Sequence, residues 1–432
     1  MEDPIGQSIN RVDGPAKVTG RAVYAYEQQV PNAAYGVLVM SSIASGRIAS
    51  MNTRAAEHSP GVLLVMTHLN APKLPPAPPK NGPGAHLQLL QDDRVLYANQ
   101  PIAVVVADTF ENANGAAQLI EARYAAETPR VDLESRIAEA FTPEEHKPRQ
   151  RGDISANLRQ AATRVEQTYW TPFEVHNPME PHATVAVWDR PDHLILYDAT
   201  QGVFSDRGRA ASLFGIPAEN VRVISPYLGG GFGSKGPVWS HVILCAMAAR
   251  QVKRPVKLAV ARPQMFGMIG CRSQTRQAIA LGAKPDGTLT AVRNDTVSHT
   301  STFDEFVERT TAPARMLYSS ESNATSQKLL RSDIGTPSYM RAPGEASGNY
   351  ALESAMDELA YALKMDPVEL RLKNYAHTDR EKNLPWSSKS LNECYRRGAA
   401  RFGWSKRPSE PRSMRDGNVL TGWGMATSTY PA

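Results

Sequence analysis

The chain has 432 residues, a mass of 47.2 kDa and a net charge of +5 at neutral pH. This length exceeds what one hydrophobic core usually organises, so it excludes a small stapled scaffold and predicts two domains or one large domain with an appendage. Hydrophobic residues make up 41% of the sequence, charged residues 21%, and no apolar run reaches the ~20 residues that cross a bilayer. We therefore expect a globular chain with no membrane span.

Charge and cysteine content narrow the class of protein further. Basic and acidic residues, 48 and 43 in number, are interspersed, which argues against a nucleic-acid partner. The three cysteines, Cys245, Cys271 and Cys394, lie far apart and form no C-x-x-C, which argues against a disulfide framework, a zinc site or an iron–sulfur cluster in this chain. The first residues lack the features of a signal peptide, so the default location is cytoplasmic, with co-export to the periplasm on a partner as the alternative.

The N-terminal part predicts a small α/β domain over residues 8–125. Short apolar runs separated by turn signals predict strands, and a polar and alanine-rich pattern predicts a helix over Phe110–Tyr124; the strands are expected at Tyr35–Met40, Gly61–Met66, Val95–Leu96 and Ile102–Ala107. The proline-rich stretch Ala71–Gly84, which includes Pro78 and Pro79, predicts a loop that either faces a partner or is a tolerated insertion.

The chain then becomes polar over 126–164, which predicts a linker, and a larger domain is expected over 165–432. Strand patterns in that domain begin with Val165–Tyr169, Ala183–Val187 and Leu194–Tyr197. No internal repeat of fixed period is present, which argues against a solenoid or a propeller.

The most informative segment is glycine-rich. A buried-strand pattern over Val221–Leu228 leads into Gly229–Gly236, and a helix pattern over Val238–Arg250 and a strand pattern over Val256–Val260 follow. Consecutive glycines let the backbone approach a ligand closely, and Pro237 suits a first helical position. We interpret the segment as a ligand-binding turn, with a ligand-free connection as the alternative.

Two nucleotide motifs are relevant to this turn. A phosphate-binding Walker motif is excluded because Ser234 precedes Lys235 and Gly236 follows it. The G-x-G-x-x-G pattern is satisfied by Gly231, Gly233 and Gly236, and Arg262 follows the next strand, so an NADP-dependent oxidoreductase is one alternative function.

Two further residues occupy unusual positions. Gln201 follows the Leu194–Tyr197 strand, and Arg341 lies between a methionine and an Ala-Pro-Gly turn before a helix predicted over Tyr350–Lys364. Strand ends commonly carry ligand-binding groups, and an arginine in such a turn is expected to meet an anion or a carboxylate. The structural alternatives are a surface glutamine and an arginine paired with Glu345 or Glu353.

Four motifs together resemble the molybdenum-binding subunit of the xanthine dehydrogenase and aldehyde oxidase family, and most of all the bacterial aldehyde oxidoreductases. The four motifs are Asp13–Gly20, Met179–His182, Gly229–Lys235 and Met340–Glu345. A further segment that resembles the family is Asp366–Arg371 with Asn374. The resemblance implies an α+β chain with an α/β-hammerhead domain and a first molybdopterin-binding domain, which is either complete or truncated at its C-terminal end. A second molybdopterin-binding domain is expected to be absent.

The resemblance also implies roles for single residues. Gln201 and the backbone amide of Phe232 resemble the groups that hydrogen-bond oxo ligands of molybdenum, and Arg341 resembles the arginine beside the metal. None of the three is a direct ligand. The implied cofactor-binding set is Gln201, Gly202, Gly230, Gly231, Phe232, Gly233 and Arg341. We interpret His176 and His182 as structural histidines rather than as metal ligands.

Two departures from the purine-oxidising relatives bear on the substrate. Gly236 stands where those relatives have a glutamate, and Pro343 where they have an aromatic residue. Both changes remove groups suited to clamping a purine, so the resemblance favours an aldehyde or a small N-heterocycle, oxidised with water as the oxygen source.

The family base, a glutamate near the C-terminus, has no counterpart here, and Arg341 is the one catalytic residue implied within this chain. The chain is expected to be inactive alone, as one half of a split subunit, a truncated product, or a non-catalytic binding or assembly protein. The implied cofactor is molybdopterin cytosine dinucleotide with molybdenum. The implied partners are an iron–sulfur subunit with [2Fe-2S] or [4Fe-4S] clusters, an FAD subunit and a polypeptide that supplies the C-terminal half. The basic stretch 396–415 is either part of that contact or a solvated face.

Overall fold

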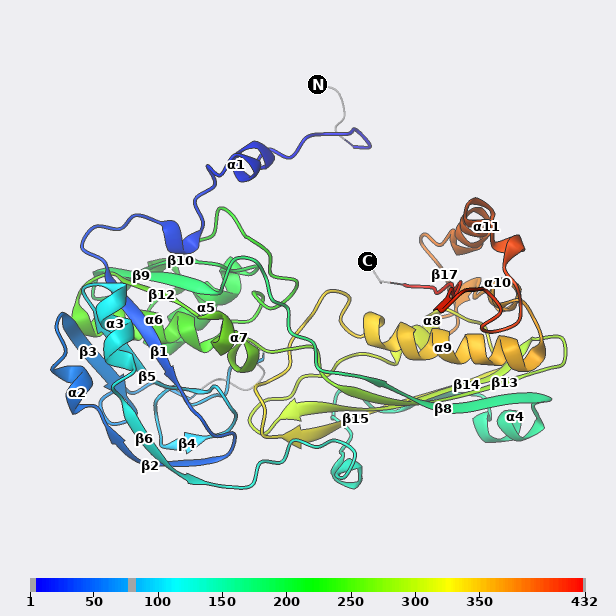
Figure 1. Cartoon of the computed structure of the whole chain (residues 1–432), viewed down its shortest axis with the longest axis horizontal. Helices are drawn as coiled ribbons and strands as arrows, with labels where there is room; N and C mark the ends of the chain where they lie inside the picture. The colour runs from blue at the N-terminus through cyan, green and yellow to red at the C-terminus, as the bar shows by residue number, and fades with distance from the viewer. Residues whose placement is uncertain (1–4, 77–82, 430–432) are drawn as a thin grey trace.

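The computed structural model describes residues 5–76 and 83–429, and two β-sheets dominate it (Figure 1). A seven-stranded sheet with its helices forms one half of the molecule, and a long five-stranded sheet crossed by one helix forms the other. This is the mixed α and β architecture that the sequence predicts. None of the helices among the described residues combines the length and apolar composition that a membrane span requires.

The seven-stranded sheet is built around continuous apolar runs. All seven residues of β5 are buried, as expected of a strand covered on both faces. In order across the sheet the strands are β11 (Val221–Ile224), β10 (His193–Asp198), β9 (Ala183–Arg190), β12 (Val256–Ala259), β1 (Ala34–Met40), β5 (Pro101–Ala107) and β3 (Val62–Thr67). Each strand predicted in these regions is present, with ends shifted by a few residues.

This sheet contains segments from both predicted domains. β1 pairs in parallel with β12 through the register pairs Ala34 with Val256 and Gly36 with Leu258. A Cβ on Gly36 would lie 3.2 Å from Val256, so glycine permits the close approach of the two strands. One hydrophobic core therefore extends across both segments, and it surrounds α6 (Ser240–Val252), which is buried from Ser240 to Ala249. The division of the chain near residue 125 stays a prediction.

The helix predicted over Phe110–Tyr124 is wrong at its C-terminal end. α3 covers Phe110–Ala117, and Glu121–Ala126 forms β6. Ala122 and Tyr124 pack against the cluster of Ile48, Val95 and Ile102, and this tertiary contact outweighs the local helical pattern. β6 completes a three-stranded sheet with β2 (Gly46–Asn52) and β4 (Arg94–Val95).

The second sheet has the order β7-β15-β14-β13-β8. Of its five strands, the sequence predicts only β8. Its strands are β7 (Arg149–Arg151), β15 (Ser322–Ser332), β14 (Leu289–Ser301), β13 (Thr275–Ala283) and β8 (Thr163–Thr171). α9 (Glu345–Leu363) packs on this sheet through its buried residues, which include Leu352, Met356 and Leu359. The helix begins five residues before the predicted start.

The segment 126–164, predicted as a linker, carries structure. β7 joins the second sheet at its edge beside β15, and α4 (Ile154–Gln160) packs Ile154 and Leu158 against it. The prolines that suggest a linker all precede β7 and lie outside helices and strands. The described parts of the proline-rich stretch, Ala71–Pro76 and Pro83–Gly84, form no helix or strand, and Pro78 and Pro79 lie outside the described residues.

The remaining elements are short. α10 (Pro367–Lys373) and α11 (Leu391–Phe402) follow α9, and two small hairpins pair β16 (Thr378–Asp379) with β17 (Leu384–Pro385) and β18 (Arg415–Asp416) with β19 (Val419–Leu420). The shorter helices are α1 (Gly14–Val18), α2 (Arg54–Glu57), α5 (Val203–Phe214), α7 (Arg262–Met268) and α8 (Ala312–Met316). Arg371, fully buried in α10, is held by Glu353 at 2.8 Å and Asp357 at 2.8 Å.

Candidate functional site

Gln201 lies where two parallel strands end. β10 and β11 are paired in parallel, so their carboxyl ends meet at one edge of the sheet, where ligands commonly bind. Thr200–Gly202 follows β10 and the glycine loop Gly229–Gly236 follows β11. The backbone N–H of Gln201 donates to the carbonyl of Lys235 at 2.7 Å, which fixes the Gln201 segment to the loop.

The glycine loop is folded tightly against its neighbours. Gly230 and Gly233 have φ of +94° and +105°, and Phe232 adopts φ of +55°, a region that a non-glycine residue enters at a cost. A Cβ on Gly231 would lie 2.5 Å from Gln201 Oε1, and one on Gly233 would lie 2.2 Å from the carbonyl oxygen of Tyr339. Only glycine fits position 233, and a side chain at position 231 would displace the Gln201 side chain.

Arg341 is joined to the loop through the backbone. Its N–H donates to the carbonyl of Phe232 at 2.8 Å, and its own carbonyl accepts from the buried Arg272 guanidinium at 2.7 Å. The expected alternative pairing of Arg341 with Glu345 or Glu353 is not formed, because Glu353 holds Arg371 and no contact between Arg341 and Glu345 is present among the described residues. The Arg341 side chain is exposed.

Three donors are carried by segments that contact one another here, and we call them the donor trio: the side-chain NH₂ of Gln201, the N–H of Phe232 and the guanidinium of Arg341. The Oε1 of Gln201 accepts from the N–H of Gly233 at 3.0 Å, which leaves its NH₂ group to donate outward. Within residues 5–76 and 83–429 none of the three donors has a hydrogen-bond acceptor. Such a set fits a ligand that carries negative oxygen atoms.

A buried ion pair anchors the loop from below. Lys235, whose side chain is completely buried, donates from Nζ to Glu180 Oε2 at 2.7 Å and to the Glu180 carbonyl at 3.0 Å. The same carboxylate accepts from the N–H of Gly229 at 2.7 Å. Burial lowers the pKa of the Lys235 ammonium, and the Glu180 carboxylate opposes this shift. This pair was not predicted from the sequence. The only indication there is that both residues belong to motifs that resemble the family.

A layer of titratable groups lies beneath the Gln201 segment. Burial raises the pKa of both Asp198 and Asp206, and their carboxyl groups share a hydrogen bond, so the pair retains a proton. Thr184 donates to Asp198. Burial lowers the pKa of His241 to about 3, and that of His182 falls well below its ordinary value for the same reason.

The two motif histidines make structural contacts. His176 Nε2 lies 2.7 Å from the carbonyl of Tyr339, and His182 Nε2 lies 3.4 Å from the carbonyl of Ser234. Both contacts brace the segments that carry the donor trio. Their interpretation as structural residues stays a prediction that these contacts support.

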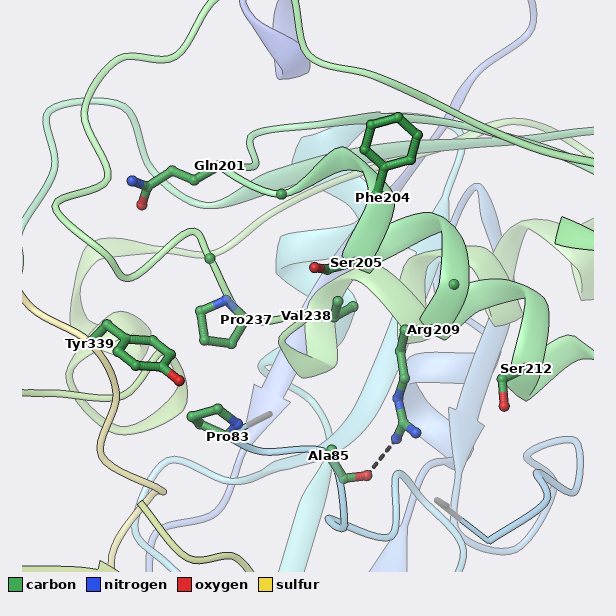
Figure 2. Close-up of a pocket in the computed structure, with 13 residues that line it drawn as sticks. Pro83, Ala85, Gln201, Phe204, Ser205, Arg209, Ser212, Pro237, Val238 and Tyr339 are labelled. Atoms are coloured by element: carbon green, nitrogen blue, oxygen red, sulfur yellow. Dashed lines mark hydrogen bonds between the residues drawn. The ribbon is translucent and has the colours of Figure 1, made fainter. Parts of the chain in front are cut away.

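A pocket of about 630 Å³ opens beside Gln201 (Figure 2). Figure 2 shows Ser205, Arg209 and Ser212 following α5 away from Gln201, with Pro83, Pro237 and Tyr339 on another wall. Arg209 donates to the carbonyl of Ala85 across the pocket. The pocket is large enough for a small organic molecule next to the donor trio.

The strand order and the helix start around the glycine loop both differ from those of a dinucleotide-binding fold. A dinucleotide fold places the two strands of its glycine motif side by side, whereas β10 and β9 separate β11 from β12 here. The predicted helix start at Pro237 is also wrong, because α6 begins at Ser240. Its N-cap is Trp239, which lies three residues after Gly236. Arg262 donates to the carbonyl of Met179 at 3.2 Å.

Comparison with known families identifies the class of protein that this fold and site define. The model of the molybdopterin cofactor-binding domain matches residues 137–375, and the model of the aldehyde oxidase and xanthine dehydrogenase a/b hammerhead domain matches residues 19–128. The chain belongs to the molybdenum-binding subunits of the aldehyde oxidase and xanthine dehydrogenase family, which are oxidoreductases. The predicted family is confirmed, as is the predicted combination of a hammerhead domain with a molybdopterin-binding domain.

Individual relatives are consistent with this membership. The chain is 39% identical over 429 residues to the aldehyde oxidoreductase molybdenum-binding subunit PaoC of Escherichia coli K12, covering 98% of this chain and 57% of the relative. It is 29% identical to the putative xanthine dehydrogenase molybdenum-binding subunit XdhA of the same organism, covering 97% of this chain and 58% of the relative. The chain thus spans a little more than half the length of these curated relatives.

Solved structures share the fold. Quinoline 2-oxidoreductase from Pseudomonas putida 86 superposes with a TM-score of 0.83 at 21% identity, covering 94% of this chain and 55% of that one. The aldehyde oxidoreductase from Desulfovibrio gigas superposes with a TM-score of 0.80 at 24% identity, covering 91% and 46%.

A substitution at Gly233 tests the packing of the loop. Gly233→Ala places a Cβ against the Tyr339 carbonyl at a positive φ, so we expect the free energy of unfolding to fall by about 2 kcal/mol or more. Urea unfolding measures the change. Gly115→Ala is the matched control, because a Cβ at this position in α3 meets nothing within 4 Å and should stabilise by up to ~1 kcal/mol. Equal effects of the two substitutions would contradict the close packing.

The proton held by Asp198 and Asp206 predicts a pH dependence. A carboxyl whose pKa is raised on folding contributes stability at low pH and loses it as the pH rises. In Asp206→Asn an amide replaces the protonated carboxyl, so the stability of the variant relative to wild type should increase by about 1 kcal/mol per pH unit between about pH 5 and 8. Urea unfolding of both proteins across this range measures it. A difference that is constant with pH would disprove the shared proton.

Proposed function

We propose that this chain holds the metal-facing side of a molybdopterin cofactor and, with the remainder of its enzyme, oxidises aldehydes or small N-heterocycles with water as the oxygen source. The observation that carries this proposal is the donor trio, in which Gln201, Phe232 and Arg341 present three unengaged donors at one sheet edge. The family model for the molybdopterin-binding domain covers all three residues.

The residues present suit such a group. When bound, the cofactor supplies molybdenum, which accepts two electrons from the substrate and transfers an oxygen atom that originates in water. The NH₂ of Gln201 and the N–H of Phe232 bind oxygen atoms that carry negative charge, and the guanidinium of Arg341 adds a full positive charge beside them. Because the glycine loop fixes these donors before any ligand arrives, little reorganisation accompanies the reaction.

We further propose that the general base comes from outside these residues. Of the two carboxylates in the family motifs, Glu180 is engaged by Lys235 and the N–H of Gly229, and Glu345 is buried to 95% in the first turn of α9. Neither lines the pocket beside Gln201. The base is therefore contributed from outside residues 1–432, by a part of the enzyme equivalent to the rest of the relatives' length, and these residues alone are inactive.

The same reasoning extends to electron transfer and the form of the cofactor. We propose molybdopterin cytosine dinucleotide as the cofactor and an iron–sulfur subunit and an FAD subunit as partners that carry electrons away. The relatives PaoC and XdhA are named as molybdenum-binding subunits, which supports a multi-subunit enzyme.

Activity of the assembled enzyme tests the donor trio. Gln201→Ala removes one donor without altering a buried group, so kcat for aldehyde oxidation should fall by about 10²-fold with little change in stability. The complex is purified from its native host, and molybdenum, iron, flavin and steady-state rates are measured for wild type and variant. Arg159→Ala, at an exposed position of α4, is the control and should change nothing. A molybdenum-free complex that binds NADP would favour the dinucleotide alternative, and a stable complex with neither cofactor would favour an assembly protein.

Substrate preference tests the pocket. Because Gly236 and Pro343 offer no carboxylate or aromatic ring to a purine, kcat/KM should be higher for benzaldehyde than for xanthine. Competition between the two substrates in the assembled enzyme measures the ratio directly. Faster turnover of xanthine would overturn the aldehyde assignment while leaving the donor trio in place.

A further inference from the structure

A second pocket lies at the β7 edge of the five-stranded sheet, and most of its charged residues are basic. It has a volume of about 350 Å³, and we call it the arginine pocket; its lining residues are Arg149, Gln150, Arg151, Arg315, Asn323, Arg380 and Glu381. Four guanidinium groups face a single carboxylate there. Neither the family motifs nor the proposed reaction uses these residues.

Strand register brings two of the arginines together. In the pairing of β7 with β15, Arg149 lies opposite Thr325 and Arg151 opposite Asn323. Since side chains alternate along a strand, Arg149 and Arg151 project from the same face. α8 contributes Arg315, and the turn after β16 contributes Arg380 and Glu381.

Three of the four guanidinium groups are held by hydrogen bonds or ion pairs. Arg151 donates to the carbonyl oxygens of Glu321 at 2.9 Å and Ser320 at 3.0 Å, so its position is fixed while its charge has no carboxylate partner. Glu381 is shared between Arg149 at 3.0 Å and Arg315 at 3.1 Å. Among the described residues Arg380 has no hydrogen-bond or ion-pair partner.

The arginine pocket, whose Arg149 and Arg380 are exposed, has the reverse charge balance to two buried arginines of this molecule. Arg371 is held by two carboxylates, Glu353 and Asp357, and Arg272 by Glu174 and Glu308. In the arginine pocket, burial lowers the pKa of Arg151 and Arg315, and the neighbouring Arg380 and Arg149 add to these shifts. A concave site with three uncompensated positive charges would be stabilised by an anion.

We propose that the arginine pocket binds an oxyanion of the phosphate class, as inorganic phosphate or pyrophosphate or as the phosphoryl groups of a nucleotide. Planar guanidinium groups bind phosphate oxygens in pairs through parallel hydrogen bonds. Arg151 supplies a guanidinium whose position is fixed. The exposed Arg380 supplies a second guanidinium, which has no partner among the described residues. Glu381 occupies part of the site and competes with the anion for Arg149 and Arg315.

Calorimetric titration of the 432-residue chain with inorganic pyrophosphate, in a buffer free of phosphate and sulfate, tests the proposal. We expect saturable binding of one pyrophosphate per chain that weakens with added salt. Arg380→Gln should weaken binding about tenfold, because it removes one charge-assisted contact. Glu381→Gln should strengthen binding several-fold, because it removes the competing carboxylate; a merely structural ion pair would not give this result.

Matched controls decide between a site and general attraction. Arg396→Gln, which makes the same change of charge on the exposed face of α11, should leave binding unchanged. Citrate tests charge without phosphate geometry and should bind more weakly than pyrophosphate, and tighter binding of CDP than of pyrophosphate would identify a nucleotide as the source of the phosphate. Absence of saturable binding at millimolar pyrophosphate, equal losses in Arg380→Gln and Arg396→Gln, or citrate binding as tight as pyrophosphate would each overturn the proposal.

Discussion

The site depends on the buried ion pair between Glu180 and Lys235. A lysine with a completely buried side chain is costly to charge, and this one is compensated by a carboxylate at 2.7 Å and a carbonyl at 3.0 Å. The backbone of the same lysine accepts from the N–H of Gln201 and the hydroxyl of Thr200. Lys235 therefore joins three segments, 180, 200–201 and the glycine loop, in one contact network. Removal of either charge would leave the other buried and unpaired, so the pair and the loop conformation depend on each other.

Backbone strain at the site has a structural explanation in these contacts. Phe232 and Ala342, neither of them glycine, have φ of +55° and +57°, and they flank the hydrogen bond between the Phe232 carbonyl and the N–H of Arg341. Conformations of this kind persist only where the surroundings determine them. Here the Glu180–Lys235 pair fixes one side and the buried Arg272, bound to Glu174 and Glu308, fixes the other. The donors are therefore held in place by these buried ion pairs rather than by contacts among themselves.

The sequence predicts the first sheet well and the second poorly, for a physical reason. Strands such as β5 are continuous apolar runs, which identify a buried strand without further information. β14 is buried along most of its length but carries Asn294, Thr296, Ser298 and His299, and one of their polar contacts, between His299 Nδ1 and the hydroxyl of Ser332, joins residues distant in sequence. No local pattern distinguishes such a strand from a loop. The donor trio was predicted from the family resemblance, whereas the Glu180–Lys235 pair, whose members are 55 positions apart, needed the three-dimensional structure.

The parallel ladder between β1 and β12 has a consequence for how the pocket beside Gln201 can respond to a ligand. Its walls come from both sides of that ladder, with Pro83 and Ala85 on one and α5 on the other, and Arg209 ties them by its bond to the Ala85 carbonyl. A hinge between the two segments would have to break main-chain hydrogen bonds inside a shared core. The two segments that contribute the pocket's walls are accordingly held together by main-chain pairing within one sheet, so a ligand there contacts both segments without any rearrangement between them.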